Sequence, residues 1–401
     1  MNSAPSQVAE SNVATKPARL YYLDWLRVLA MFSIFFFHSD RFFDFDGWHV
    51  KNAATSLAST IHIQFFNQWM MPLFFILSGA AVYYSLRSRT GGGFIKERSL
   101  RILIPWIFIG IFVIAPPQVY LERLIHGEFS GTFFQFYYPH YFDGIYAFGG
   151  NFAIVPMHLW YLVLLFLFSL IALPLFLPSK NTGKSLTSRL ATSFEKPWAL
   201  LLLFVPLAAV AILADVVGLG FTRQMGSWDM LSYLMFFIYG YLIVSNTKIL
   251  EVIRRYSTPA LIVALVLTVL LFVLYIYLES RRPELLHVFS VWMGLLTLRG
   301  LLAWCWIIAI LGFGSRYLNF NNRFLGYATE AVLPFYILHQ TIILIIGFFV
   351  VQWSMGIAPK YFIIATTSFV AIMVIYDLMV RRINVLRFLF GMRLTKKLKV
   401  T

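Results

Sequence analysis

The chain has 401 residues, of which 60% are hydrophobic and 12% are charged, and its mean hydropathy is +0.76. Soluble domains carry about 25% charged residues, so this composition excludes an ordinary soluble protein and indicates a polytopic membrane protein. The formal net charge is +15 at pH 7. The only cysteine, Cys305, cannot form an intrachain disulfide and has no partner for a metal-ligand spacing.

The two ends of the chain differ from the rest in composition. The first residues, MNSAPSQVAESNVATKPA, are small and polar. They predict a disordered cytoplasmic tail over residues 1–20 without a cleavable signal peptide, which would need an apolar central region. Residues 381–401 are basic and are expected to form a cytoplasmic tail beside the membrane lipids. Residues 21–380 are expected to form the membrane domain.

The membrane domain divides into apolar segments. A helix needs about 20 mainly apolar residues to cross the hydrocarbon core. The segments that qualify are 21–42, 61–86, 100–118, 157–178, 198–218, 227–245, 258–278, 288–314, 328–351 and 360–380. The predicted fold is therefore all-α, with about ten transmembrane helices. The eighth segment is the least regular, because it contains Arg299.

The charges of the connecting loops predict their sides, because cytoplasmic loops are enriched in Lys and Arg. The basic connections are 87–99, 179–197 and the tail after residue 380. The acidic connections are 43–60, 119–156 and 215–229. Both termini are therefore expected in the cytoplasm. This topology and the basic tail explain the net charge without nucleic-acid binding.

Three polar residues interrupt the first segment, LDWLRVLAMFSIFFFHSD: Asp24, Arg27 and His38. Ionisable groups inside a membrane are costly and by default face a cavity or a partner. Arg27 and His38 are eleven residues apart, about three helical turns, so both project from nearly one face and His38 lies about 16 Å further out. Asp24 shares that face and can pair with Arg27. The structural alternatives are a snorkelling ion pair for Asp24 and Arg27 and a packing hydrogen bond for His38.

Two further motifs precede or open the third segment. In FFILSG, Ser78 and Gly79 permit close approach of helices. Arg98 and Arg101 stand three residues apart at the cytoplasmic entrance of the segment, where two guanidiniums suit a phosphate clamp. Ordinary positive-inside charges would produce the same pattern, so both interpretations stay open.

Polar residues also mark the fourth and ninth segments. His158 and Trp160 in VPMHLWYL are expected at the outer interface, where a tryptophan of the aromatic belt is the usual explanation. Glu330 and His339 in YATEAVLPFYILHQ are nine residues apart with a proline between them. A proline can break a membrane helix where it borders a cavity, so we predict a cavity at this point.

In this order, the motifs resemble those of the family-3 membrane acyltransferases. Arg27 and His38 match the Arg-x10-His signature of that family. FFILSG, RSLRILIP, HLWYL and FYILHQ follow in the family's order, so that the resemblance runs from residue 21 to about residue 345. The outer stretch GWHVKN is similar to the glucan-modifying branch, whose members are described as succinyltransferases of periplasmic glucans. The resemblance implies a multi-pass protein of the bacterial inner membrane.

The resemblance implies transfer of an acyl group from cytoplasmic acyl-CoA to a hydroxyl on the outer side, with acyl-CoA as co-substrate and no tightly bound cofactor or metal. His38 is expected to be the general base or a transient acyl carrier, and Asp24 is expected to orient Arg27. CoA carries several phosphate charges. The residues expected to bind it are Arg27, Ser78, Arg98 and Arg101.

Glu330 and His339 are expected to line the same cavity, where His339, backbone amides or the Trp160 N–H stabilise the oxyanion. Sugars stack on aromatic rings and bond to imidazoles. The residues expected to bind a saccharide acceptor are Trp48, His49, Tyr138, His158 and Trp160. A succinyl group would favour a further cation, for which the sequence offers Arg41 or Arg299, whereas an acetyl group needs none.

Two other classes of function would use the same residues. A transporter or flippase for a glycan or polyol could have intramembrane Arg, His and Glu along its path, although no internal repeat is detectable, which disfavours a transporter. A membrane scaffold or sensor would leave the stripe of Asp24, Arg27 and His38 unexplained. Turnover of acyl-CoA distinguishes these classes. The oligomeric state cannot be read from the sequence.

Overall fold

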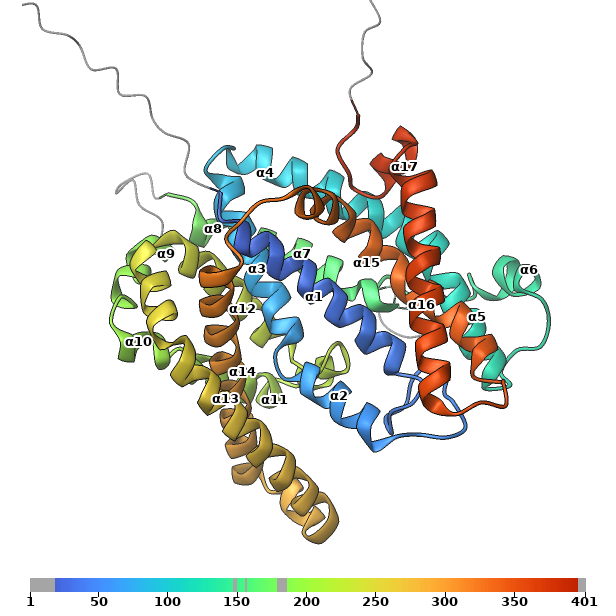
Figure 1. Cartoon of the computed structure of the whole chain (residues 1–401), viewed down its shortest axis with the longest axis horizontal. Coiled ribbons are helices and arrows are strands. Elements are labelled where there is room, and N and C mark those ends of the chain that lie inside the picture. The colour runs from blue at the N-terminus through green and yellow to red at the C-terminus, as the bar shows by residue number, and fades with distance from the viewer. Residues whose placement is uncertain (1–18, 147–149, 156, 179–185, 396–401) are drawn as a thin grey trace, which may run out of the picture.

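The computed structural model describes residues 19–146, 150–155, 157–178 and 186–395. Within these ranges the chain forms helices and no β-strand. Most of the expected N-terminal tail and the last six residues of the expected C-terminal tail lie outside the described residues. In Figure 1, helices α4 and α17 and the start of α1 lie toward the same end of the bundle.

Helices of very different lengths make up the described part of the chain. The first nine α-helices are α1 (Tyr21–Asp40), α2 (Leu57–Asn67), α3 (Met70–Leu86), α4 (Gly91–Arg98), α5 (Ala115–Ile125), α6 (Phe133–Gln135), α7 (Trp160–Ile171), α8 (Leu173–Phe176) and α9 (Leu186–Ser193). The others are α10 (Pro197–Leu201), α11 (Phe204–Val216), α12 (Met230–Ser245), α13 (Thr247–Arg281), α14 (Phe289–Tyr317), α15 (Arg323–Val350), α16 (Ile357–Ile375) and α17 (Asn384–Leu389). The π-helical segments are η1 (Ser99–Leu103), η2 (Pro105–Ile114), η3 (Phe136–His140) and η7 (Tyr376–Val380), and the 3₁₀ turns are η4 (Met157–Leu159), η5 (Gly220–Gln224) and η6 (Pro283–His287).

Seven helical stretches in the described part of the chain are long and apolar enough to cross a membrane. They are Leu57–Leu86, Gly91–Ile125, Pro197–Val216, Thr247–Arg281, Phe289–Tyr317, Arg323–Val350 and Ile357–Val380. Two shorter apolar stretches, Met157–Ile171 and Met230–Ser245, coincide with the predicted fourth and sixth segments, and α1 covers the first. The protein is therefore an all-α, multi-pass membrane protein, as predicted.

Helix α1 lies inside the bundle, because it packs against α3, α14, α15 and α16. Its residue Phe35 is 1% exposed and meets Phe335 of α15 and Phe369 of α16 edge to face. Aromatic contacts of this kind add to the burial of apolar area. The polar residues of α1 are consequently surrounded by other helices rather than by lipid alone.

Helices α3 and α12 approach each other at two glycines. A Cβ on Gly79 would lie 1.9 Å from the backbone oxygen of Phe237, and a Cβ on Gly240 would lie 1.9 Å from that of Ile76. Neither position can carry a side chain without moving the helices apart. The close approach predicted from Ser78 and Gly79 is therefore present, and it brings α3 and α12 into backbone contact.

The predicted third segment departs from regular α-helix. It belongs to the stretch Gly91–Ile125, whose middle is π-helical over η1 and η2. Pro105 begins η2 and lacks the amide hydrogen of a regular helix. In a π-helix the hydrogen bond spans five residues instead of four, so each residue advances by a smaller angle about the axis. Arg98 is the last residue of α4 and Arg101 lies inside η1, so the spacing of a regular α-helix does not apply between them.

Candidate active site

Two histidines from distant parts of the chain meet in the bundle. Nδ1 of His38, in α1, lies 2.9 Å from Nε2 of His339, in α15. Nδ1 of His339 lies 2.6 Å from the backbone carbonyl oxygen of Tyr336. Because a carbonyl oxygen only accepts, a neutral His339 carries its proton on Nδ1 and accepts at Nε2 from His38. A neutral His38 therefore donates through Nδ1 and has an unprotonated Nε2.

The unprotonated nitrogen of His38 belongs to a ring that lines a cavity of about 760 Å³. No hydrogen bond from a described residue reaches this nitrogen. The ring of His38 stacks against Trp48, with ring centroids 6.2 Å apart and an interplanar angle of 17°. A neutral imidazole with a free lone pair at a cavity wall is the arrangement that a general base requires.

Four of the five residues expected to bind the acceptor line the same cavity: Trp48, His49, His158 and Trp160. Trp160 stacks on Tyr233, with centroids 5.5 Å apart. The fifth expected residue, Tyr138, is 82% exposed on the connection between α5 and α7 and does not line the cavity. The structure thus gathers the residues of the motifs GWHVKN and HLWYL around His38 and leaves Tyr138 outside.

Buried hydrogen bonds orient His158. Its Nε2 donates to the carbonyl oxygen of Tyr336 at 3.1 Å, and the hydroxyl of Tyr336 donates to the carbonyl oxygen of His158 at 2.5 Å. The side-chain amide of Gln118 lies 3.4 Å from Nδ1 of His158. The carbonyl of Tyr336 thus accepts from both His158 and His339, which holds these two rings in a defined relative position.

A second amide continues the network to His49. The side-chain amide of Gln340 donates to the side-chain oxygen Oε1 of Gln118 at 2.9 Å. The same amide nitrogen lies 3.4 Å from Nε2 of His49. Nδ1 of His49 lies 2.5 Å from a carboxylate oxygen of Glu122. Each of these polar groups along the wall therefore has a hydrogen-bond partner, which favours one arrangement of the cavity.

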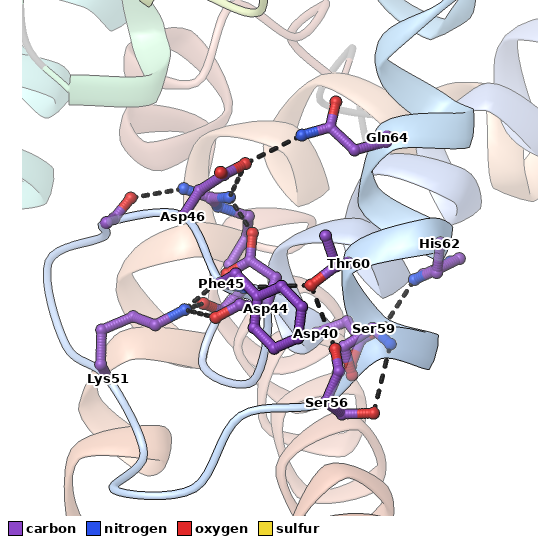
Figure 2. Close-up of polar contacts among 12 residues, drawn as sticks. Asp40, Asp44, Phe45, Asp46, Lys51, Ser56, Ser59, Thr60, His62 and Gln64 are labelled. Carbon is purple, nitrogen blue, oxygen red and sulfur yellow. Dashed lines mark hydrogen bonds and ion pairs between the residues drawn. The ribbon is translucent and has the colours of Figure 1, made fainter. Parts of the chain in front are cut away.

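The connection between α1 and α2, residues 41–56, carries Trp48 and His49 to the cavity, and a buried carboxylate holds it. Asp44 is fully buried and forms ion pairs with Arg41 and Lys51 (Figure 2). Burial raises the pKa of the Asp44 carboxyl and lowers the pKa of the Lys51 ammonium. Arg41 also donates to the backbone carbonyl oxygen of Gly47, directly before Trp48, at 2.6 Å. The ion pairs thereby position the loop that places Trp48 on His38.

Helices α1 and α2 are joined by a further set of polar contacts, drawn in Figure 2. Asp40, the last residue of α1, accepts from the hydroxyl of Ser59 and contacts Nδ1 of His62, both at 2.8 Å. Asp46 accepts from the Gln64 amide at 3.0 Å. These contacts hold the loop against α2.

At the other end of α1, three of the four residues expected to bind acyl-CoA lie around Tyr161. The Ser78 hydroxyl is 2.6 Å from the Tyr161 hydroxyl, and the charges of Arg27 and Arg98 act on Tyr161. Arg27 contacts Asp24 at 3.3 Å. Arg98 lies over the ring of Phe94 at 5.1 Å and has no ion pair within the described residues.

The fourth residue expected to bind acyl-CoA is Arg101. It lies 3.7 Å from Glu97 and lines a second hollow, of about 390 Å³, between α4 and α17. Arg98 does not line that hollow. Arg98 instead lies over Phe94. The phosphate clamp formed by the two arginines stays a prediction.

Glu330, expected near the catalytic histidine, lies elsewhere. Its carboxylate pairs with Arg387 at 2.7 Å and with Arg381 at 3.7 Å. It is nine residues before His339 on the same helix, about 13 Å along the axis, and does not line the cavity of His38. The structure therefore brings His339, but not Glu330, to the catalytic candidate.

The two arginines considered for a succinyl group also have different positions. Arg41 lines the cavity, one helical turn beyond His38. Arg299 lies over the ring of Trp228 at 4.4 Å and does not line the cavity. Only Arg41 is therefore placed where it could meet a group bound beside His38.

Several residues of the site were missed by reasoning from the sequence, among them Gln118, Gln340 and Tyr336. The two glutamines could have been selected from the sequence, because a side-chain amide inside an apolar segment is costly unless it is hydrogen-bonded. Tyr336 contributes its backbone carbonyl. The side-chain pattern carries no information about that group.

Comparison with known proteins identifies the class. Residues 20–377 match the acyltransferase domain of family 3. This match covers most of the chain, so the protein belongs to the family-3 acyltransferases and is a membrane acyltransferase.

Among its relatives is glucans biosynthesis protein C of Escherichia coli O157:H7, 24% identical over 406 residues. Glucans biosynthesis protein C of Escherichia coli K12 is 23% identical over the same length. Each alignment covers 98% of this chain and 96% of the relative. No solved structure matches the chain.

Proposed function

We propose that this acyltransferase moves a succinyl or acetyl group from cytoplasmic acyl-CoA to a hydroxyl of a glucan or another saccharide on the outer side of the bacterial inner membrane. The observation that carries the proposal is the free Nε2 of His38 at a cavity whose lining includes Trp48 and Trp160. Aromatic faces and imidazoles suit a polyhydroxylated acceptor. Acyl-CoA is the co-substrate, so the reaction needs no tightly bound cofactor.

The proposed topology has ten transmembrane helices and both termini in the cytoplasm. It puts Arg27 and Arg98 on the side of the donor and the cavity of His38 on the side of the acceptor. Arg27 and His38 are eleven residues apart on α1, about 16 Å along the helix. The slender pantetheine arm of CoA therefore runs beside α1 from the arginines to the histidine.

In the proposed reaction, Nε2 of His38 accepts the proton of the acceptor hydroxyl while the hydroxyl oxygen attacks the thioester carbonyl carbon. His339 and the Tyr336 carbonyl stabilise the imidazolium through the chain of hydrogen bonds. The tetrahedral intermediate then expels the CoA thiolate, which takes the proton from His38. In the alternative in which His38 carries the acyl group, the same nitrogen is the nucleophile.

The oxyanion of that intermediate needs a donor. Both ring nitrogens of His339 are already engaged, so His339 orients His38 instead. The indole of Trp160 lines the cavity, and its N–H has no hydrogen-bond partner among the described residues. We assign the oxyanion contact to Trp160.

Arg41 decides between the two acyl groups in this proposal. A succinyl group extends beyond the thioester carbonyl and ends in a carboxylate, which would meet a cation one turn beyond His38. Arg41 stands there, paired with the buried Asp44. Its weaker contact, 3.7 Å, is with the half-exposed Asp46. A ligand carboxylate can replace that contact, so we favour succinyl as the transferred group.

The test is acyl transfer by the purified, detergent-solubilised protein. Release of free CoA is followed from succinyl-CoA and from acetyl-CoA with a glucan acceptor, for wild type and His38→Ala. We expect release that depends on the acceptor, is faster with succinyl-CoA, and is abolished in the variant while its thermal melt is unchanged. A variant as active as wild type would refute the role of His38. Glycan transport in vesicles without CoA release would favour a transporter instead.

A further inference from the structure

The hollow between α4 and α17 is not used by the chemistry at His38. We infer that it binds the nucleotide end of the acyl-CoA donor, the 3′-phosphorylated adenosine diphosphate. This inference rests on the proposed function and extends it to a second part of the molecule. The hollow lies at the end of the bundle where α4 and α17 are seen in Figure 1.

The charge of the hollow fits phosphate. Lys96 and Arg101 line it, and the only acidic residue of its lining is Glu97. That single carboxylate faces two guanidiniums, Arg89 at 3.2 Å and Arg101 at 3.7 Å. The charge of Arg393 acts on Arg101 as well. Basic charge therefore exceeds acidic charge around the hollow, which attracts a multiply charged anion.

The rest of the lining fits a flat apolar ring. Phe388 of α17 and Leu100 of η1 line the hollow and are 40% and 42% exposed. No aromatic contact of Phe388 with another described ring is present. A purine base can stack on such an aromatic face, and stacking on an aromatic ring is the usual way in which proteins bind an unpaired base.

A series of arginines leads from the hollow toward the interior. The charges of Arg101 and Arg27 both act on Arg98. Arg27 and Arg98 both lie near Tyr161, which is hydrogen-bonded to Ser78. CoA has its phosphates at the nucleotide end and an uncharged pantetheine arm. The molecule therefore follows the arginines with its charged end in the hollow and its arm directed to His38.

The wall formed by α17 is fixed in place. Gly391 has a φ of +70°, and a Cβ there would lie 2.5 Å from the backbone oxygen of Arg101. Arg387 donates to Glu330 at 2.7 Å and to the backbone carbonyl of Arg393 at 2.8 Å. Glu330 thus acquires a role that the sequence did not suggest, because it holds the segment that closes the hollow.

The first experiment compares two donors in the full-length protein. The double variant Lys96→Gln, Arg101→Gln is assayed with acyl-CoA and with acyl-pantetheine, which lacks the nucleotide. We expect kcat/KM with acyl-CoA to fall about 30-fold, since contacts to charged groups are lost, and kcat/KM with acyl-pantetheine to stay within about twofold of wild type. The control is Lys248→Gln, Arg255→Gln, which removes two positive charges from α13, outside the hollow. An equal loss with both donors would overturn the inference.

The second experiment needs no turnover. Binding of adenosine 3′,5′-bisphosphate to the wild-type protein and to the double variant is measured by calorimetry. We expect binding to wild type and at least tenfold weaker binding to the variant. This result supports the inference even if no acyl transfer is found, so that the failure of the proposed function would be recognised separately. Equal binding to both proteins, or an effect of the variant that appears only with acidic phospholipid vesicles, would overturn it.

Discussion

The two ends of α1 hold polar side chains in opposite ways. Around His38 the imidazole rings are hydrogen-bonded to other protein groups. His38 is bonded to His339, and both His339 and His158 are bonded to the backbone carbonyl of Tyr336. Around Arg98, a guanidinium lies over Phe94 without an ion pair among the described residues. The end with His38 is organised by hydrogen bonds, whereas the end with Arg98 has a cation without a paired carboxylate among the described residues.

In the proposed reaction, the two ends of α1 have different tasks. A base must present one nitrogen in one orientation, and a chain of hydrogen bonds supplies that orientation before substrate arrives. A site for a highly charged donor gains most when its cations are not already neutralised by carboxylates. In this proposal the polar residues form an outer group around His38 and an inner group around Arg98, with separable effects on kcat and on the KM for the donor.

The largest effect is expected for His38→Ala. Loss of a general base lowers rates by about 10²–10⁴-fold, so we expect kcat/KM to fall about 10³-fold for both substrates. The measurement is CoA release at several acceptor concentrations. The control is His287→Ala, in the turn η6 between α13 and α14, which should behave as wild type. A change confined to the KM for acyl-CoA would place His38 with the inner group.

A smaller loss is expected for His339→Ala. This change removes the acceptor of the His38 Nδ1–H bond but leaves the base itself, so we expect kcat to fall about 10–100-fold, the usual effect of losing an orienting partner. The double variant His38→Ala, His339→Ala should be no slower than His38→Ala alone, because the two residues act as a unit. Additive losses would show that His339 has an independent role.

Arg98→Ala tests the inner end. We expect the KM for acyl-CoA to rise about tenfold, because a positive charge beside the path of the anionic donor is lost, while the KM for the acceptor and kcat change less than about twofold. The matched control is Arg255→Ala, an exposed arginine of α13. A parallel rise of both KM values would mean that the inner and outer groups are not separate.

The smallest effect is expected for Trp48→Ala. The indole stacks on His38 and borders the cavity, and an aromatic contact contributes about 0.5–1.5 kcal/mol beyond its buried area. We expect the KM for the glucan acceptor to rise about three- to tenfold with little change in the KM for acyl-CoA. Trp353→Ala, half exposed after α15, is the control. An unchanged acceptor KM would remove Trp48 from the acceptor site.

Much of the architecture was predictable from the sequence. Apolar length determined the membrane segments, because an uninterrupted run must be hydrogen-bonded internally as a helix. The spacing of Arg27 and His38 placed both on one face of α1. The exception is the third segment, which is π-helical over η1 and η2, around Pro105. A pattern based on 3.6 residues per turn cannot detect such a change of winding.

Residue order alone established that this chain is a multi-pass helical protein with a costly polar stripe in its first helix. It also provided the ordered motifs of its family. The packing of the helices was needed to show which nitrogen of His38 is free, because that depends on a backbone carbonyl 298 positions away at Tyr336. Packing also placed Glu330 against α17 and brought Arg41, not Arg299, to the cavity. Side-chain partners depend on how helices pack, and residue spacing along one helix does not contain that information.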